Sequence, residues 1–98
     1  MDTARLLALL ADHMPELRRR FGVSGLALFG SAARGSAGPS SDVDLLVDFV
    51  EPPAADAARY FGLQFYLEDL LGRPVDLVTR KALRERLRPY VERDAIAV

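Results

Sequence analysis

The sequence contains no cysteine, which excludes a disulfide framework and any metal site built on thiolates. It also lacks an apolar run approaching the roughly 20 residues that a membrane-spanning helix needs. A secretory leader is not expected either, because Asp12, His13 and Glu16 interrupt the apolar positions near the start. These absences predict a cytoplasmic protein with no membrane partner.

The sequence also has no large excess of positive or negative charge. The 13 basic and 14 acidic side chains leave a formal net charge of −1, which gives no general reason to expect nucleic acid as a partner. The chain has 98 residues, and 50% of them are hydrophobic. Domains of this size bury only about 60–65% of their unfolded surface. We therefore expect one domain over residues 1–98, with some apolar surface left for a partner.

Hydrophobic spacing predicts the order of the helices and strands. Helical spacing occurs at residues 3–21, 56–71 and 79–91. Short apolar runs typical of strands occur at residues 25–29, 42–50 and 74–78. The buried stripe of the first helix is predicted to be Leu6, Leu10, Met14, Leu17 and Phe21. The alternation of helices and strands favours an α/β or α+β domain in which helices pack a small sheet.

Two aspartates stand at the entrance of the second predicted strand. Side chains alternate along a strand, so Asp42 and Asp44 face the same way with their bases about 6.5–7 Å apart. Their charges repel by about 2–3 kcal/mol at an effective dielectric of about 20, and a divalent cation removes that repulsion. Asp76 lies in the third predicted strand and can reach the same cation if the two strands are neighbours.

Each aspartate alone also fits a structural interpretation, as a turn, strand-edge or surface residue. The three together, with a glycine turn just upstream, favour a metal site. Asp48 shares their face but lies four residues beyond Asp44, so we expect it to be solvated and outside the site. His13 is the single histidine and lies far from the aspartates in sequence, which favours a structural or surface role.

A glycine and a serine follow the first predicted strand directly. Backbone N–H groups at such a turn, with the Ser31 hydroxyl beside Gly30, suit phosphate oxygens. A P-loop is excluded because Ser36-Ala37 stands where Lys followed by Ser or Thr is required. A dinucleotide fingerprint is excluded because Ala32 occupies its second glycine position.

The motif Gly-Ser-Ala-Ala-Arg-Gly at residues 30–35, followed by Ser-Asp-Val-Asp-Leu-Leu-Val at 41–47, closely resembles the signature of the DNA polymerase β-like nucleotidyltransferases. It is most similar to that of their smallest branch, the minimal nucleotidyltransferases. The resemblance continues over residues 71–78, where the family places its third aspartate, and covers nearly the whole chain. It implies the polymerase β-like fold, with a small mixed sheet.

The resemblance also implies a reaction, the transfer of AMP from ATP to a hydroxyl with release of pyrophosphate. Asp42 and Asp44 would bind two Mg²⁺ ions, and Asp76 would complete the metal site and help to activate the attacking hydroxyl. Two metals stabilise the attacking and leaving oxygens of an in-line displacement.

By the same resemblance, the glycine turn is the binding site for the triphosphate. Gly30 and Ser31 would hold the β- and γ-phosphates. Arg34 would support the turn or a phosphate. ATP is the usual donor in the family.

The acceptor is expected on another macromolecule, because the nucleotide-binding fold uses almost every residue. Minimal nucleotidyltransferases are typically paired with an α-helical HEPN-domain protein, often a ribonuclease toxin. The resemblance therefore implies an antitoxin that adenylylates a tyrosine of that toxin within a hetero-oligomer. The chain is not itself the HEPN ribonuclease, whose Arg-x4–6-His pattern is absent because Arg5 lies too far upstream of His13.

Two other functions stay open. The chain can neutralise a partner by contact alone, keeping the nucleotide fold as a scaffold, although a scaffold has no need of mutually repelling carboxylates. It can also act alone on a small hydroxylated molecule, which the lack of an acceptor domain disfavours.

Two surface features fit either a partner or an ordinary structural role. Aromatic side chains on more than one side of the helix at 56–71 indicate an interface or a largely buried helix: Tyr60, Phe61, Phe65 and Tyr66. The last predicted helix is either a solvated basic face or a surface for phosphate, RNA or an acidic partner: Arg80, Lys81, Arg84, Arg86, Arg88 and Arg93.

Overall fold

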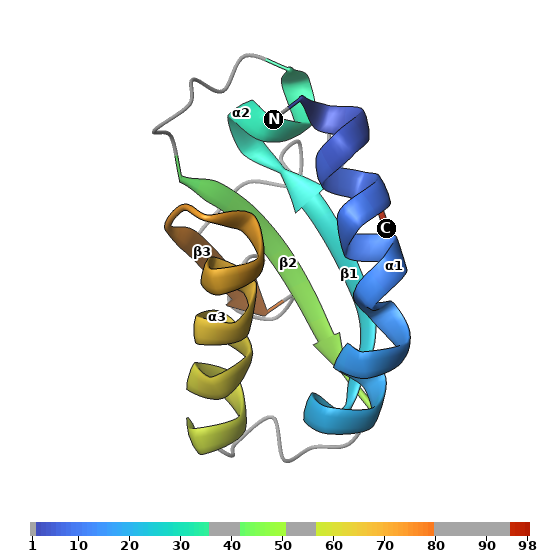
Figure 1. The fold of residues 1–98 in the computed structure, drawn as a ribbon, viewed down its shortest axis with the longest axis vertical. Helices are drawn as coiled ribbons and strands as arrows, with labels where there is room; N and C mark the ends of the chain where they lie inside the picture. The colour runs from blue at the N-terminus through green and yellow to red at the C-terminus, as the bar shows by residue number, and fades with distance from the viewer. Residues whose placement is uncertain (1, 36–41, 51–56, 80–94) are drawn as a thin grey trace.

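A computed structural model of the chain describes residues 2–35, 42–50, 57–79 and 95–98 (Figure 1). In chain order its elements are α1 (Thr3–Phe21), β1 (Val23–Phe29), α2 (Gly30–Arg34), β2 (Val43–Phe49), α3 (Ala57–Leu71), β3 (Val75–Thr79) and β4 (Ile96–Ala97). No helix in these ranges is long and apolar enough to cross a membrane.

The first helix forms as its apolar spacing predicts. The side chain of Asp2 caps its start by accepting a hydrogen bond of 2.8 Å from the backbone N–H of Arg5. Gly22 ends it in the left-handed conformation, with φ 69°, and donates to the carbonyl of Arg18. The predicted stripe is confirmed, since its members are all buried: Leu6, Leu10, Met14, Leu17 and Phe21.

The strands form one mixed sheet in the order β3-β2-β1-β4. Strand β1 is antiparallel to both of its neighbours, whereas β2 and β3 are parallel. The predicted small mixed sheet is therefore confirmed. Strand β4 was not predicted, because two residues are too few to carry a strand pattern and only pairing with Ala27 and Leu28 defines it.

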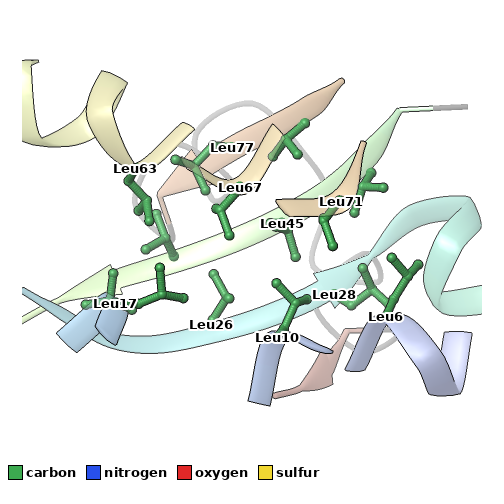
Figure 2. Close-up of a cluster of buried hydrophobic side chains, with 14 of the residues drawn as sticks. Leu6, Leu10, Leu17, Leu26, Leu28, Leu45, Leu63, Leu67, Leu71 and Leu77 are labelled. Carbon is green, nitrogen blue, oxygen red and sulfur yellow. The ribbon is translucent and has the colours of Figure 1, made fainter. Parts of the chain in front are cut away.

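Helices α1 and α3 lie side by side on one face of the sheet (Figure 1). The leucines of both helices point toward those of the strands and form the main core (Figure 2). Because side chains alternate along strands, every second residue points to the other face. A smaller cluster of buried side chains lies there: Ala27, Phe29, Leu46 and Val78. Asp44 and Asp76 belong to this second face, since both of their neighbours in each strand are in the main core.

Some predicted boundaries differ from the structure. Strand β1 starts at Val23 instead of Gly25, because Val23 pairs with Phe49, the last residue of β2. On α3 the buried leucines follow steps of four, at Leu63, Leu67 and Leu71, and Leu70 is half-buried. Thr79, the first residue of the helix predicted at 79–91, is the last residue of β3. The rest of that predicted helix with its basic side chains, and Asp56, lie outside the described residues.

Candidate functional site

The carboxylates of Asp44 and Asp76 belong to neighbouring strands at the same level. In the parallel pairing of β2 with β3, Asp44 lies directly beside Asp76. The pairing begins where the backbone N–H of Val43 donates to the carbonyl of Pro74 at 2.9 Å. The condition on which the sequence prediction depended, that the two strands are neighbours, is therefore met.

Asp44 is held in an environment that disfavours its charge. It is half-buried, whereas Asp42, just ahead of β2, and Asp76 are exposed. Burial raises the pKa of the Asp44 carboxyl, and the negative charges of Asp76 and then Asp42 raise it further. The nearby positive charge of Arg34 acts in the opposite direction. The aspartates thus form one electrostatic group centred on Asp44.

The glycine turn lies against this group. Phe29, the last residue of β1, pairs with Asp44, and Gly30 follows with a φ of 70° that side-chain-bearing residues rarely adopt. A Cβ built on Gly30 would overlap Oδ2 of Asp44 and lie 3.1 Å from its Cγ. Ser31 is half-buried in the first turn of α2, and Arg34 is exposed at its end. The structure therefore brings all the residues predicted for phosphate binding to the side of Asp44.

Helix α2 is fixed by a contact that the sequence did not indicate. The hydroxyl of Thr3, in the first turn of α1, donates to the carbonyl of Ala32 at 2.5 Å. The backbone N–H of Gly35, with a φ of 74°, donates to the same carbonyl. Thr3 precedes Ala32 by 29 positions, so no local pattern could have revealed this partner.

The donor set fits magnesium, which prefers oxygen ligands. No group of three or more His, Asp or Glu side chains in the described ranges is already arranged to hold a metal ion. A complete protein cage is not required, because magnesium is usually held by one or two carboxylates together with substrate phosphates and water. Asp44 and its neighbours fit such an ion chemically, since a cation offsets the repulsion that raises the pKa of Asp44.

Two other residues from the sequence prediction lie elsewhere. Nδ1 of His13 is 2.8 Å from the hydroxyl of Tyr66, a bond that joins α1 to α3, so its predicted structural role is confirmed. Asp48 lies opposite Gly25, far along β2 from the site, as predicted. It is half-buried and not fully solvated, because its carboxylate packs close to the Gly25 backbone.

Carboxylates grouped beside a tight glycine turn can hold the cations with which many enzymes act on phosphate esters. Comparison with known protein families identifies which of these enzymes the chain resembles. The family model described as the nucleotidyltransferase domain matches residues 10–98, and the chain belongs to that family. It is a nucleotidyltransferase.

The relatives agree with this assignment. Protein adenylyltransferase MntA of Thermococcus cleftensis is 44% identical over 91 residues, which cover 93% of this chain and 90% of MntA. A candidate protein adenylyltransferase of Methanocaldococcus jannaschii is 40% identical over 85 residues, covering 87% of this chain and 82% of the relative. These matches confirm the prediction that the chain belongs with the nucleotidyltransferases.

Two solved structures share the fold. One, described as a candidate minimal nucleotidyltransferase, has a TM-score of 0.73 and 40% identity, and the match covers 100% of this chain and 97% of that chain. The other is a crystal structure of a toxin-antitoxin with AMP-PNP, with a TM-score of 0.56 and 26% identity. That match covers 84% of this chain and 60% of the solved chain.

Proposed function

We propose that residues 1–98 form a single minimal nucleotidyltransferase domain that transfers AMP from ATP to a hydroxyl of a partner protein. The observation that carries the proposal is the position of Asp44, beside Asp76 on the next strand and against the backbone of Gly30. Relatives named protein adenylyltransferases support a protein as the acceptor.

The carboxylates of Asp42 and Asp44 would hold two magnesium ions, which supply charge stabilisation at the α-phosphate when bound. The oxygen of the attacking hydroxyl would form a bond to the α-phosphorus, and Asp76 would accept the proton of that hydroxyl. The bond from that phosphorus to pyrophosphate breaks, and pyrophosphate leaves with its electron pair. The carboxylates would thus hold the cations, position the hydroxyl and take up its proton.

The turn would hold the rest of the nucleotide. With no side chain at Gly30, its backbone can approach the β- and γ-phosphates closely, and the hydroxyl of Ser31 would donate to them. Arg34 places a positive charge near the site, as its effect on the pKa of Asp44 indicates, and would offset phosphate charge.

The partner we propose is an α-helical HEPN-type toxin, with one of its tyrosines as acceptor. Support comes from the similarity to the solved toxin-antitoxin that contains AMP-PNP. The chain would then act as the antitoxin within a hetero-oligomer. The aromatic side chains of α3 are divided between two roles, since Tyr60 and Tyr66 pack against the core whereas Phe61 and Phe65 are exposed.

The test is intact-mass spectrometry of the co-expressed HEPN-type partner after incubation with this chain, ATP and magnesium. We expect the partner to gain whole AMP units, and to gain none with the Asp42→Asn/Asp44→Asn double variant. No gain in mass, with neutralisation of the toxin intact in the double variant, would instead support neutralisation by binding alone. Transfer to a small hydroxylated molecule without the partner would contradict the proposed acceptor.

A further inference from the structure

The outer edge of β3 is bonded to side chains of α3. In the described sheet β3 lies at one end, with β2 as its only strand neighbour. Gln64 Nε2 donates to the carbonyl of Val75 at 3.2 Å, and the N–H of Val75 donates to Oε2 of Glu68 at 3.0 Å. The hydroxyl of Tyr60 donates to the carbonyl of Leu77. Backbone groups on both sides of Asp76 are therefore fixed from the helix.

The spacing of helix and strand makes this arrangement possible. Tyr60, Gln64 and Glu68 are four residues apart, so they follow one side of α3 at intervals of about 6 Å. Outward-facing backbone groups of a strand recur every second residue, at intervals of about 6.6 Å. The helix and strand run in opposite directions, since the earliest helix residue bonds the latest strand residue. The two periods match for the bonds from Tyr60 to Leu77 and from Gln64 to Val75. Glu68, one turn further along α3, bonds the N–H of the same Val75.

We propose that Tyr60, Gln64 and Glu68 are positioning residues that hold Asp76 in register with Asp44. The proposal rests on the proposed function, in which these carboxylates act together. These three hydrogen bonds end on the backbone of Val75 and Leu77, and Asp76 stands between those residues. The three side chains would therefore act on the site through the strand.

Register decides whether the site exists. A slip of β3 by one residue would turn Asp76 into the main core and expose Val75 and Leu77 on the other face. A slip by two residues would keep Asp76 on the second face of the sheet but move it about 6.6 Å along β2, away from Asp44. Either slip would break the bonds from α3 to the backbone of Val75 and Leu77 in addition to the backbone bonds between β2 and β3. The bonds from α3 therefore add to what must be broken before Asp76 can leave its place beside Asp44.

The matched test compares two neighbouring carboxylates on α3. Glu68→Leu removes the acceptor for the Val75 N–H, whereas Asp69→Leu removes an equal charge from an exposed position one residue later. Glu68→Gln keeps an oxygen that can accept the same bond. Tyr60→Phe removes only the hydroxyl that reaches Leu77. Each variant is made in the full chain, and its folded fraction is measured by circular dichroism.

Two measurements report on the site without the acceptor protein: Mn²⁺ affinity by electron paramagnetic resonance and amide hydrogen exchange at Val75 to Leu77. We expect Glu68→Leu to weaken Mn²⁺ binding about 10-fold per folded molecule, as changes to groups that support metal ligands do. Exchange at Val75 should accelerate. Tyr60→Phe should act in the same direction, while Glu68→Gln and Asp69→Leu should bind Mn²⁺ as the parent does.

Unchanged Mn²⁺ affinity in Glu68→Leu and Tyr60→Phe, with only a lower melting temperature, would overturn the positioning role and leave a structural one. Equal losses in Glu68→Leu and Asp69→Leu would overturn it too, because charge and not the strand bond would then be responsible. AMP transfer is measured separately. If the parent transfers no AMP while Glu68→Leu and Tyr60→Phe weaken Mn²⁺ binding and the two control variants do not, the positioning role stands and the proposed function fails.

Discussion

The carboxylate of Asp44 occupies the space that a side chain on Gly30 would fill. A Cβ at that position would overlap Oδ2 and lie 3.1 Å from Cγ and 3.3 Å from Cβ of Asp44. Asp44 is fixed in β2, and Gly30 directly follows its register partner Phe29, so neither residue can retreat alone. Glycine is therefore needed at position 30 for two reasons: the turn has a positive φ, and the Asp44 carboxylate leaves no room for a side chain.

Gly30→Ala is predicted to abolish AMP transfer and destabilise the fold. The positive φ costs an alanine about 1–2 kcal/mol, and the overlap with Asp44 adds about 1–3 kcal/mol. The matched control is Gly72→Ala, which has nearly the same φ, 69°, but no atom of the described residues beyond its chain neighbours within 4 Å of the added Cβ. It should lose stability alone and keep its activity per folded molecule. Equal activity in both variants would show that the Asp44 contact is irrelevant to catalysis.

Asp44→Asn is predicted to abolish transfer while stabilising the metal-free protein. Burial and two neighbouring carboxylates raise the pKa of Asp44, so its charged form is disfavoured in the folded state. The gain should stay below about 1 kcal/mol because solvent screens a half-exposed carboxylate, which corresponds to at most about 4–8 °C in melting temperature. Thermal unfolding at neutral pH in EDTA measures it. A lower melting temperature would contradict the repulsion.

The same pKa predicts how stability depends on pH. The folded state holds the Asp44 proton to a higher pH than the unfolded state does. The free energy of unfolding of the metal-free protein should therefore fall as pH rises from the ordinary carboxylate range through the raised pKa of Asp44. Asp44→Asn should remove this component, and urea unfolding at a series of pH values measures it. An identical slope in the parent and the variant would rule out Asp44 as its source.

Magnesium should stabilise the protein through the same carboxylates. A ligand that binds only the folded state at about 100 times its dissociation constant adds about 2.7 kcal/mol. We expect magnesium with a non-hydrolysable ATP analogue to raise the melting temperature of the parent but not of Asp42→Asn/Asp44→Asn. Sodium chloride at matched ionic strength is the control, because a general screening effect would raise both proteins alike.

The bond between His13 and Tyr66 is predicted to affect stability alone. It joins α1 to α3 on the helical face of the sheet, away from the second face that carries Asp44. Tyr66→Phe should lower the free energy of unfolding by about 0.5–1.5 kcal/mol, the usual net value of a hydrogen bond. Transfer activity per folded molecule should not change. A double-mutant cycle with His13→Ala checks that the loss belongs to this pair.

The exposed aromatic residues of α3 should matter to the proposed toxin partner and little to the fold. Phe61 and Phe65 are 53% and 66% exposed. Substituting both by glutamine should change the free energy of unfolding by less than about 0.5 kcal/mol, as is usual for surface positions. Affinity for the toxin, measured by calorimetry, should fall at least about tenfold, because truncating a central aromatic of an interface commonly costs more than 1 kcal/mol. Unchanged affinity would place the toxin elsewhere.

The parts of the fold that repeat along the chain could be predicted from the sequence. The buried residues of α1 recur every three or four positions, a spacing typical of a helix. The aspartates of β2 and β3 are easily recognised because their neighbours in sequence are apolar. Pairwise contacts between distant segments could not. Thr3 meets Ala32 through the packing of two helices, and Glu68 meets Val75 because α3 returns along the edge of the sheet. The space that Gly30 leaves for Asp44 likewise depends on strand register, which no local pattern encodes.

The bond between Thr3 and Ala32 has a practical consequence for handling the protein. It places the start of α1 beside the turn proposed to hold the triphosphate (Figure 1). An affinity tag or fluorescent label joined ahead of Thr3 would therefore project near the nucleotide and crowd it.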